Sequence, residues 1–266
     1  MLRPALLAVV LFALSTHNAP AQILYSESFS IVTDSTKVLA GQVQPDLNIR
    51  TQRRLLVEFE NRADLSVRLG RNAFTFANKL DVARFGAETL LSGGYLHGEY
   101  RRIGERELLR NEFFAQVQWA DARGLERKVA VGYHTRLRLL HEGENRLFVG
   151  VGPFVERERW GYRGIEDDER PAAPPPDART DIKYSAYVST KLAPAERVAL
   201  DLSAYFQNRF DAPVGRGRVA LSLQGGYRFT KYLSGIVLYQ NLYDPRPVVP
   251  IDEWYHRFDV GVNVNF

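Results

Sequence analysis

The chain has 266 residues and no cysteine, with 35 Lys and Arg against 31 Asp and Glu. Without cysteine it can form neither a disulfide framework nor a thiolate metal site. A net charge of +4 is too balanced for a nucleic-acid binder that relies on charge. The only long apolar run lies at the N-terminus, which excludes a helical membrane protein, and aromatic residues reach 12%, which favours strands.

The first 21 residues have the three parts of a secretory signal peptide. Arg3 gives a positive start, residues 4–14 are apolar, and Ala19 and Ala21 supply the small residues of a signal peptidase site. The apolar stretch is too short for a permanent anchor. We expect cleavage after Ala21, a periplasmic segment over residues 22–35 and a folded domain over residues 36–266.

The rest of the chain alternates between apolar and polar residues with period 2, which places the two sets on opposite faces of a strand. The last strand is the clearest case. Its apolar positions are Phe258, Val260, Val262, Val264 and Phe266, and its polar or glycine positions are Arg257, Asp259, Gly261, Asn263 and Asn265.

On this basis the sequence predicts about twelve strands. They centre on residues 38–50, 54–69, 72–84, 93–102, 109–119, 127–139, 146–160, 180–192, 197–210, 217–229, 232–243 and 255–266. Strand 232–243 is apolar on both parities, and its tyrosines favour the odd positions as the outer face. Asn61 and Asn78 interrupt the otherwise apolar set of their strands.

These features predict an all-β fold, a closed antiparallel transmembrane β-barrel. A soluble barrel shows the same alternation with its faces reversed. The membrane interpretation is favoured by roughly 20 residues per strand and connection, by the charge on one face of many strands, and by the terminal Phe266, which resembles the signal read by the barrel assembly machinery.

The connections alternate in length. Residues 161–180 and 244–253 form long loops, residues 85–92 and 211–216 form intermediate ones, and the turns between them are short. With both termini in the periplasm, the long loops would be extracellular. Aromatic residues near that rim are predicted to form a girdle at the membrane interface: Trp119, Trp160, Tyr162, Trp254 and Tyr255.

The polar parity predicts a lumen lined by both signs of charge. Its predicted lining residues are Glu58, Glu60, Arg62, Asp64, Arg68, Lys79, Asp81, His97, Glu99, Arg101, Glu112, Arg136, Arg138, Glu156, Asp201, Arg228 and Asp259, with Arg50, Lys128, Lys183 and Arg209 on the same parity. Two interpretations remain open: a narrow polar conduit whose charges select solutes, and an ion-pair network that fills the barrel, which the close alternation of charges favours.

No residue pattern predicts catalysis or a cofactor. A Ser-His-acid site needs a nucleophile beside a base, and no outward serine neighbours a histidine in the predicted strand order. His97, Glu99 and Glu112 on neighbouring strands form either a metal site or, more often, a hydrogen-bonded cluster; we expect no metal. Arg157 and Arg159 face outward near the outer rim, where they would contact either lipopolysaccharide phosphates or solvent.

Three strand segments have distinctive sequences: GGYLHGEYRR (93–102), RNEFFAQVQWAD (110–121) and RLFVGVGPFVERERW (146–160). In these segments and through the last strand, the sequence resembles the salt-induced outer membrane protein family. The resemblance implies an outer-membrane barrel and supplies no catalytic residues.

We therefore expect an integral barrel of a Gram-negative outer membrane, with a structural or narrow-channel role and no enzymatic activity. Its expected partners are outer-membrane lipid, lipopolysaccharide and, during biogenesis, the barrel assembly machinery, with no nucleic acid. The alternative is a surface adhesion or partner-binding barrel that acts through loops 161–180 and 244–253, the first of which contains the Pro-rich run 170–176.

Overall fold

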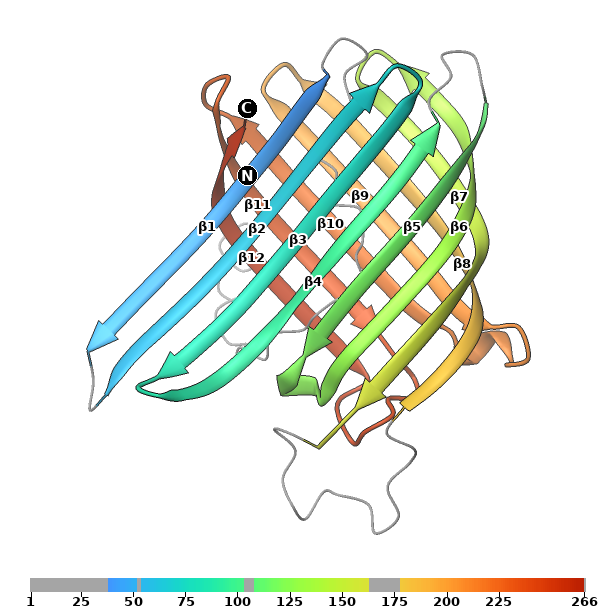
Figure 1. Ribbon diagram of the computed structural model, residues 1–266. Coiled ribbons are helices and arrows are strands. Elements are labelled where there is room, and N and C mark those ends of the chain that lie inside the picture. Colours follow the sequence, from blue (N-terminus) through green and yellow to red (C-terminus); the bar gives the residue numbers. More distant parts are fainter. Residues whose placement is uncertain (1–37, 52–53, 103–107, 163–177, 266) are drawn as a thin grey trace, which may run out of the picture.

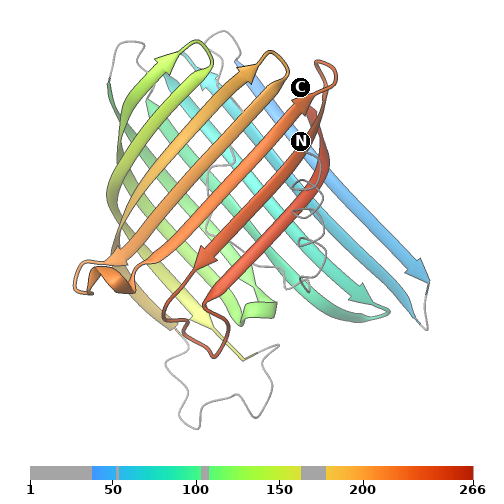
Figure 2. The ribbon, with the colours of Figure 1, turned by 180° about the vertical axis from the view of Figure 1, so that it is seen from behind.

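The computed structural model describes residues 38–51, 54–102, 108–162 and 178–265. Twelve strands, each antiparallel to its neighbours in sequence, form a closed barrel (Figures 1 and 2). This confirms the predicted fold class. The strands are β1 (Leu39–Thr51), β2 (Leu55–Leu69), β3 (Asn72–Phe85), β4 (Glu88–Arg102), β5 (Leu109–Ala120), β6 (Leu125–Glu142), β7 (Asn145–Trp160), β8 (Ala178–Ala195), β9 (Val198–Arg209), β10 (Arg218–Arg228), β11 (Leu233–Tyr243) and β12 (Trp254–Asn265).

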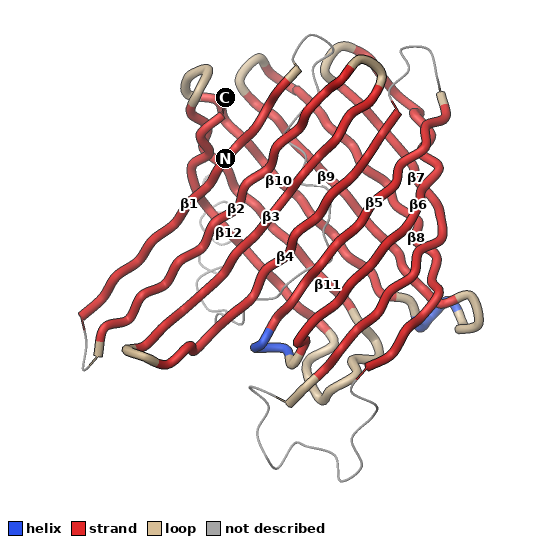
Figure 3. The backbone as a smooth tube through the Cα atoms, viewed as in Figure 1, coloured by secondary structure: helices blue, strands red, loops and turns tan. Residues whose placement is uncertain are grey.

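Helical structure within the described ranges is limited to two short 3-10 turns, η2 (Asp121–Arg123) and η4 (Val214–Arg216). Figure 3 shows how the strands account for nearly all of the barrel wall. No helix in these ranges is long and apolar enough to cross a membrane.

Strand β7 shows how the sequence sets the two faces of the wall. Its β-branched Val151 and Val155 point outward and are 54% and 47% exposed, whereas Glu156 points inward and is 1% exposed. Successive side chains of a strand point to opposite faces, so one parity faces the outside throughout. In β11 the odd positions Leu233 and Val237 are exposed and the even position Leu238 is fully buried, as predicted for this ambiguous strand.

One predicted loop is wrong. Residues 85–92 were expected to form an intermediate loop, but β3 and β4 are joined by a tight turn at Gly86 and Ala87, and β4 begins at Glu88. Gly86 has φ +64°, a conformation that glycine adopts without steric cost, and its amide donates to the carbonyl of Leu55 over 2.8 Å. The rim that carries the β7–β8 and β11–β12 connections, which we call the loop-bearing rim, therefore also contains this short β3–β4 turn.

The barrel closes between β1 and β12 over a short register. Among the described residues, Gln42 pairs with Asn265 and Val43 with Val264, whereas β1 and β2 are paired along the whole of β1. Pro45 lies two residues after Val43 in β1 and has no amide hydrogen to donate to a ladder. We call this junction the seam.

The outer face is apolar along the barrel, with exposed residues such as Ile49, Val131, Val151 and Ile182. Asn61 and Asn78 interrupt this face, as the sequence indicated, and there the Nδ2 of Asn61 donates to the Oδ1 of Asn78 over 3.2 Å. The two side-chain amides therefore hydrogen-bond to each other while both lie on the outer face.

Candidate functional site: the barrel lumen

The inner face of the barrel carries a dense set of buried charges. Glu112, Glu156 and Glu158 are at most 2% exposed. Of the residues predicted to line the lumen, the structure buries Arg62, Asp64, Lys79, His97, Glu99, Glu112, Arg136, Glu156 and Asp201. Glu60, Asp81, Arg101 and Asp259 are half-buried on the same face. Buried charges must be paired to be tolerated, so the arrangement of partners determines what the lumen can do.

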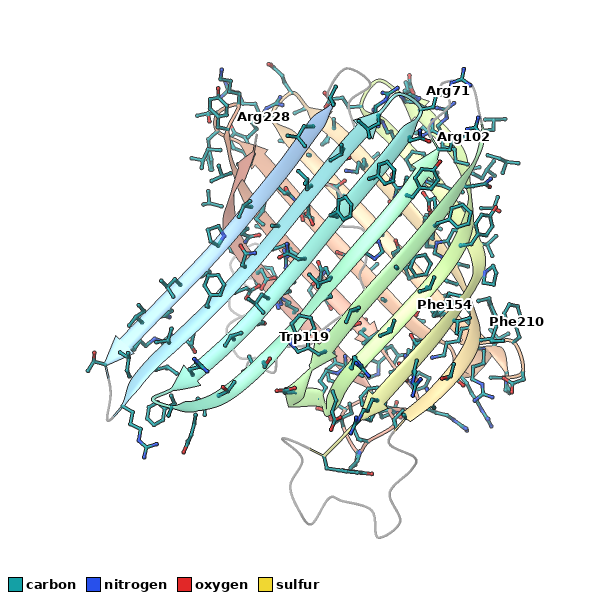
Figure 4. The ribbon with its side chains drawn as sticks, in the orientation of Figure 1. Arg71, Arg102, Trp119, Phe154, Phe210 and Arg228 are labelled. Atoms are coloured by element: carbon teal, nitrogen blue, oxygen red, sulfur yellow. The ribbon has the colours of Figure 1, made fainter. Side chains whose placement is uncertain are left out.

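Other predicted lining residues lie at the ends of the barrel. The exposed Arg228 donates to the carbonyl of Glu196 over 2.6 Å, and Figure 4 shows it at one rim. Glu58 has a side chain that is 42% exposed and pairs with Arg50 over 3.2 Å, and Arg68 donates to the carbonyl of Gly70 over 3.0 Å. Arg138 contacts His141 near the β6–β7 turn. Parity fixes the direction of a side chain but not its depth, so these residues hold turns and rims together.

The first cluster lies beside the seam, and we call it the seam cluster. It comprises Glu60, Arg62, Lys79, Asp81, Arg257 and Asp259. Arg257 on β12 contacts Asp259 over 2.7 Å and Glu60 on β2. Arg62 on β2 contacts Asp259 over 3.3 Å. These ion pairs join β2 directly to β12, past β1, and thus hold the barrel closed where backbone pairing is short.

The second cluster centres on Glu112 of β5, and we call it the central cluster. Its carboxylate accepts from Arg136 over 2.7 Å, contacts Arg101 over 2.8 Å and accepts from the hydroxyl of Tyr187. The guanidinium of Arg136 also lies 3.7 Å from the ring centroid of Phe148, within the range of a cation–π contact. One buried carboxylate thereby links β4, β5, β6 and β8, and the contact between Arg136 and Phe148 adds β7.

A row of rings lies beside the central cluster. Ring centroids are separated by 6.0 Å between His97 and Phe114, 5.0 Å between Phe114 and His134, 5.2 Å between His134 and Tyr187, and 5.1 Å between Tyr187 and Tyr205. These separations are within the range of favourable aromatic pairs. The row spans β4 to β9 and fills part of the interior with apolar volume.

The third cluster lies nearer the loop-bearing rim, and we call it the outer cluster. Glu156 and Glu158 on β7 contact Lys128 on β6, Lys183 on β8 and Arg218 on β10. Arg218 contacts Glu158 over 2.7 Å and Glu156 over 3.3 Å. Since β7 and β10 are separated by two strands in the barrel order, Arg218 reaches across the interior and narrows it.

The loop between β11 and β12 folds over this end of the barrel. Val249 in that loop is 2% exposed and belongs to a hydrophobic cluster on the opposite side of the barrel order. The other buried members of that cluster are Ala120, Leu125 and Trp160. The loop therefore extends across the mouth from β11–β12 to β5–β7.

Two polar contacts accompany this loop. At its start, Asp244 accepts from the Nε of Arg218 over 2.7 Å, which ties the loop to the outer cluster. Arg123 of η2 lies 3.8 Å from the ring centroid of Tyr255, at the start of β12. Burial lowers the pKa of Arg123, because removal from water disfavours the charged form.

The predicted aromatic girdle is corrected in two places. Trp160 is 5% exposed and Tyr255 is 7% exposed, and both point into the barrel. Trp160 shares the parity of Glu158, to which its Nε1 donates over 3.2 Å, and Tyr255 shares the parity of Arg257. Trp254, 55% exposed, faces outward. A position at a strand end is therefore not enough to predict that an aromatic side chain faces the membrane. The parity of the residue within its strand would have separated inward-facing from outward-facing aromatic residues.

The three residues considered as a metal site, His97, Glu99 and Glu112, have different partners. His97 Nε2 lies 3.8 Å from Glu99, and Glu112 is engaged by arginines and a tyrosine. Within the described parts of the chain, no group of three or more His, Asp or Glu side chains is arranged to hold a metal ion.

Sequence reasoning omitted several of the best-connected charges from the predicted lining residues. These are Glu158, Asp181, Arg218 and Arg257. All four have the inward parity of their strands, so the signal was present. Arg218 and Asp181 lie at strand starts, where the alternation is too short to be recognised.

Comparisons with known proteins find similarity among solved structures but not among protein families or curated proteins. No protein-family model and no curated protein matches this chain. Among solved structures, the translocator domain of autotransporter NalP from Neisseria meningitidis is similar, with a TM-score of 0.38 and 13% sequence identity, over 86% of this chain and 88% of that chain.

Proposed function

We propose that this chain is an integral β-barrel of a Gram-negative outer membrane, with a structural or narrow-channel role. The observation that carries the proposal is the inverted distribution of side chains. Residues such as Val131 and Ile182 are 57% and 64% exposed on the outer face, whereas Glu156 is 1% exposed inside. Soluble monomers rarely expose such a large contiguous apolar surface, whereas a barrel in lipid requires one.

The contacts inside the barrel favour the structural role over a wide pore. The seam, central and outer clusters cross-link many of the strands, and Arg218 spans the interior between β7 and β10. The loop that carries Val249 lies over one mouth. A channel through this barrel would be narrow and lined by paired charges, whose selectivity for ions is weaker than that of a ring of one sign.

The proposal includes several features that follow from the sequence. They are export through a cleaved signal peptide, biogenesis through the barrel assembly machinery with Phe266 as its signal, contact with outer-membrane lipid and lipopolysaccharide, membership of the salt-induced outer membrane protein family, and the lack of an enzymatic activity. Residues 1–37 and 266 lie outside the described residues.

Adhesion through the loops is the alternative function. Of the two loops it invokes, the one at residues 244–253 has Asp244 and Val249 buried against the barrel, which leaves less of it for a partner. Most of the other, including the Pro-rich run, lies outside the described residues. We therefore favour the barrel itself as the functional unit.

Heat-modifiable migration tests the membrane barrel directly. Detergent-folded protein should migrate differently on a denaturing gel before and after boiling, because a closed barrel resists the detergent until it is heated. Identical migration of boiled and unboiled samples would contradict the proposal. Planar-bilayer recording then separates the two roles: small single-channel steps support a narrow channel, and their absence from heat-modifiable protein leaves the structural role.

A further inference from the structure

A group of arginines on the outer face of β6 and β7 is unlike the rest of that face. Arg127, Arg157 and Arg159 are exposed and have outward parity. In the register of these strands, Arg127 is directly opposite Arg159, and Arg157 is opposite Val129. We call these three residues the basic patch. Lumen carboxylates such as Glu112 and Glu156 contact cations, whereas the basic patch places like charges side by side on the outer face.

Like charges directly opposite one another on a sheet are destabilising. The described contact that offsets them is one ion pair, between Arg159 and Glu126 over 2.8 Å, with the two side chains 57% and 48% exposed. Three arginines thus share one described carboxylate. A surface of this kind gains stability when an anion binds between the guanidinium groups.

The position of the basic patch indicates which anion. Along β7 the outward residues Val151 and Val155 are exposed and apolar, and the next outward positions are Arg157 and Arg159. Along β6, Arg127 precedes the exposed Val129 and Val131. The patch therefore lies where the apolar band ends, at the rim that carries the β7–β8 connection (Figure 1).

We infer that the basic patch binds the phosphate groups of a phosphorylated outer-leaflet lipid. Arginine presents a planar fork of donors that matches phosphate oxygens bidentately. Directly opposite Arg157 on β8 lies the exposed Thr180, whose hydroxyl adds a donor beside the guanidinium. The acyl chains of the same lipid would lie on the valines below the patch. This inference rests on the proposed membrane location.

The test uses bisphosphorylated lipid A and the detergent-folded full chain, with binding followed by native mass spectrometry. The triple variant Arg127→Gln, Arg157→Gln, Arg159→Gln should bind lipid A at least about tenfold more weakly, the effect of losing one charge-assisted hydrogen bond. A triple Arg→Lys variant should keep more of the affinity, because it keeps the charge but loses the bidentate geometry.

The matched control removes three arginines from the other end of the barrel. Arg71, Arg102 and Arg228 are exposed, and Figure 4 shows all three at the opposite rim, with Arg228 apart from the other two. Their replacement by Gln changes the net charge equally and should leave lipid A affinity unchanged. An equal loss in this control would overturn the inference, since it would indicate non-specific charge attraction.

Two further measurements define the occupant. Dephosphorylated lipid A should bind the unaltered chain as weakly as the triple Gln variant binds lipid A, and equal binding of the two lipids would overturn the inference. Inorganic phosphate alone should not compete at millimolar concentration. Neutralising the acidic run at residues 166–169 should leave the affinity unchanged; a large gain would show that this run occupies the patch instead.

The same samples are tested for heat-modifiable migration. A barrel that shifts on boiling but does not bind lipid A contradicts this inference alone. A chain that does not shift contradicts the proposed function as well, so the two failures are distinguishable.

Discussion

Two polar side chains on the apolar outer face form a hydrogen bond with each other. Asn61 and Asn78 lie on neighbouring strands of the apolar face, and the amide of Asn61 donates to the side-chain oxygen of Asn78 over 3.2 Å. The sequence identified both as irregularities, but it could not show that they meet, because that depends on the register of β2 against β3.

The pair gives a prediction with a definite sign. Asn61→Leu or Asn78→Leu alone should lower the free energy of unfolding by about 1–3 kcal/mol, because the remaining amide loses its partner. The double Leu variant should be close to the unaltered protein or more stable, since both polar groups are then absent. Denaturant unfolding of the vesicle-folded protein measures all three. Additive losses in the double variant would contradict this explanation.

The same limit applies to the lumen. Parity predicted which residues face inward, because period 2 is a local property of each strand. It could not predict partners such as Arg257 and Glu60, which are 197 residues apart in sequence and meet only because the barrel closes. Nor could parity predict how deep in the barrel a residue lies. Arg228 was predicted to line the lumen but lies at a rim.

At the scale of elements, the strands and most of the described turn positions were predictable from the sequence, but the conformations of the longer connections were not. All twelve predicted strands agree with the structure to within a few residues at most ends, and β4 differs most, beginning at Glu88. A connection takes its conformation from contacts with distant elements. The sequence predicts residues 244–253 only as a long extracellular loop. It does not show that Val249 packs on Ala120, Leu125 and Trp160 of the far wall.

Val249→Asp should release this loop, because an unpaired carboxylate is costly at a position that is 2% exposed. We expect faster cleavage of residues 244–253 by a protease of broad specificity, with the barrel still heat-modifiable. Val214→Asp is the matched control: Val214 lies in another loop and is 70% exposed, so its cleavage pattern should not change. Equal protection of residues 244–253 in both variants would contradict the inward docking of the loop.

At the scale of the whole molecule, the two faces reverse the usual relation between charge and burial. The mean hydropathy of −0.26 averages an apolar exterior with a charged interior, so it gives no sign of either. The near balance of 35 basic and 31 acidic residues corresponds to an interior in which carboxylates such as Glu112 and Glu156 each contact more than one cation.

The surroundings of the outer face can be tested with one kind of substitution at two depths. Val151, near the middle of β7, is 54% exposed, and Leu69, at the end of β2, is 58% exposed. In a bilayer, Val151→Arg should lower the free energy of unfolding by about 2–4 kcal/mol and Leu69→Arg by about 0–1 kcal/mol, because the cost of a charge depends on its depth in the lipid. In water, both exposed positions should tolerate arginine to within about 0.5 kcal/mol. Denaturant unfolding from lipid vesicles measures the difference between the two variants, and equal, small effects would show that this face is not in contact with lipid.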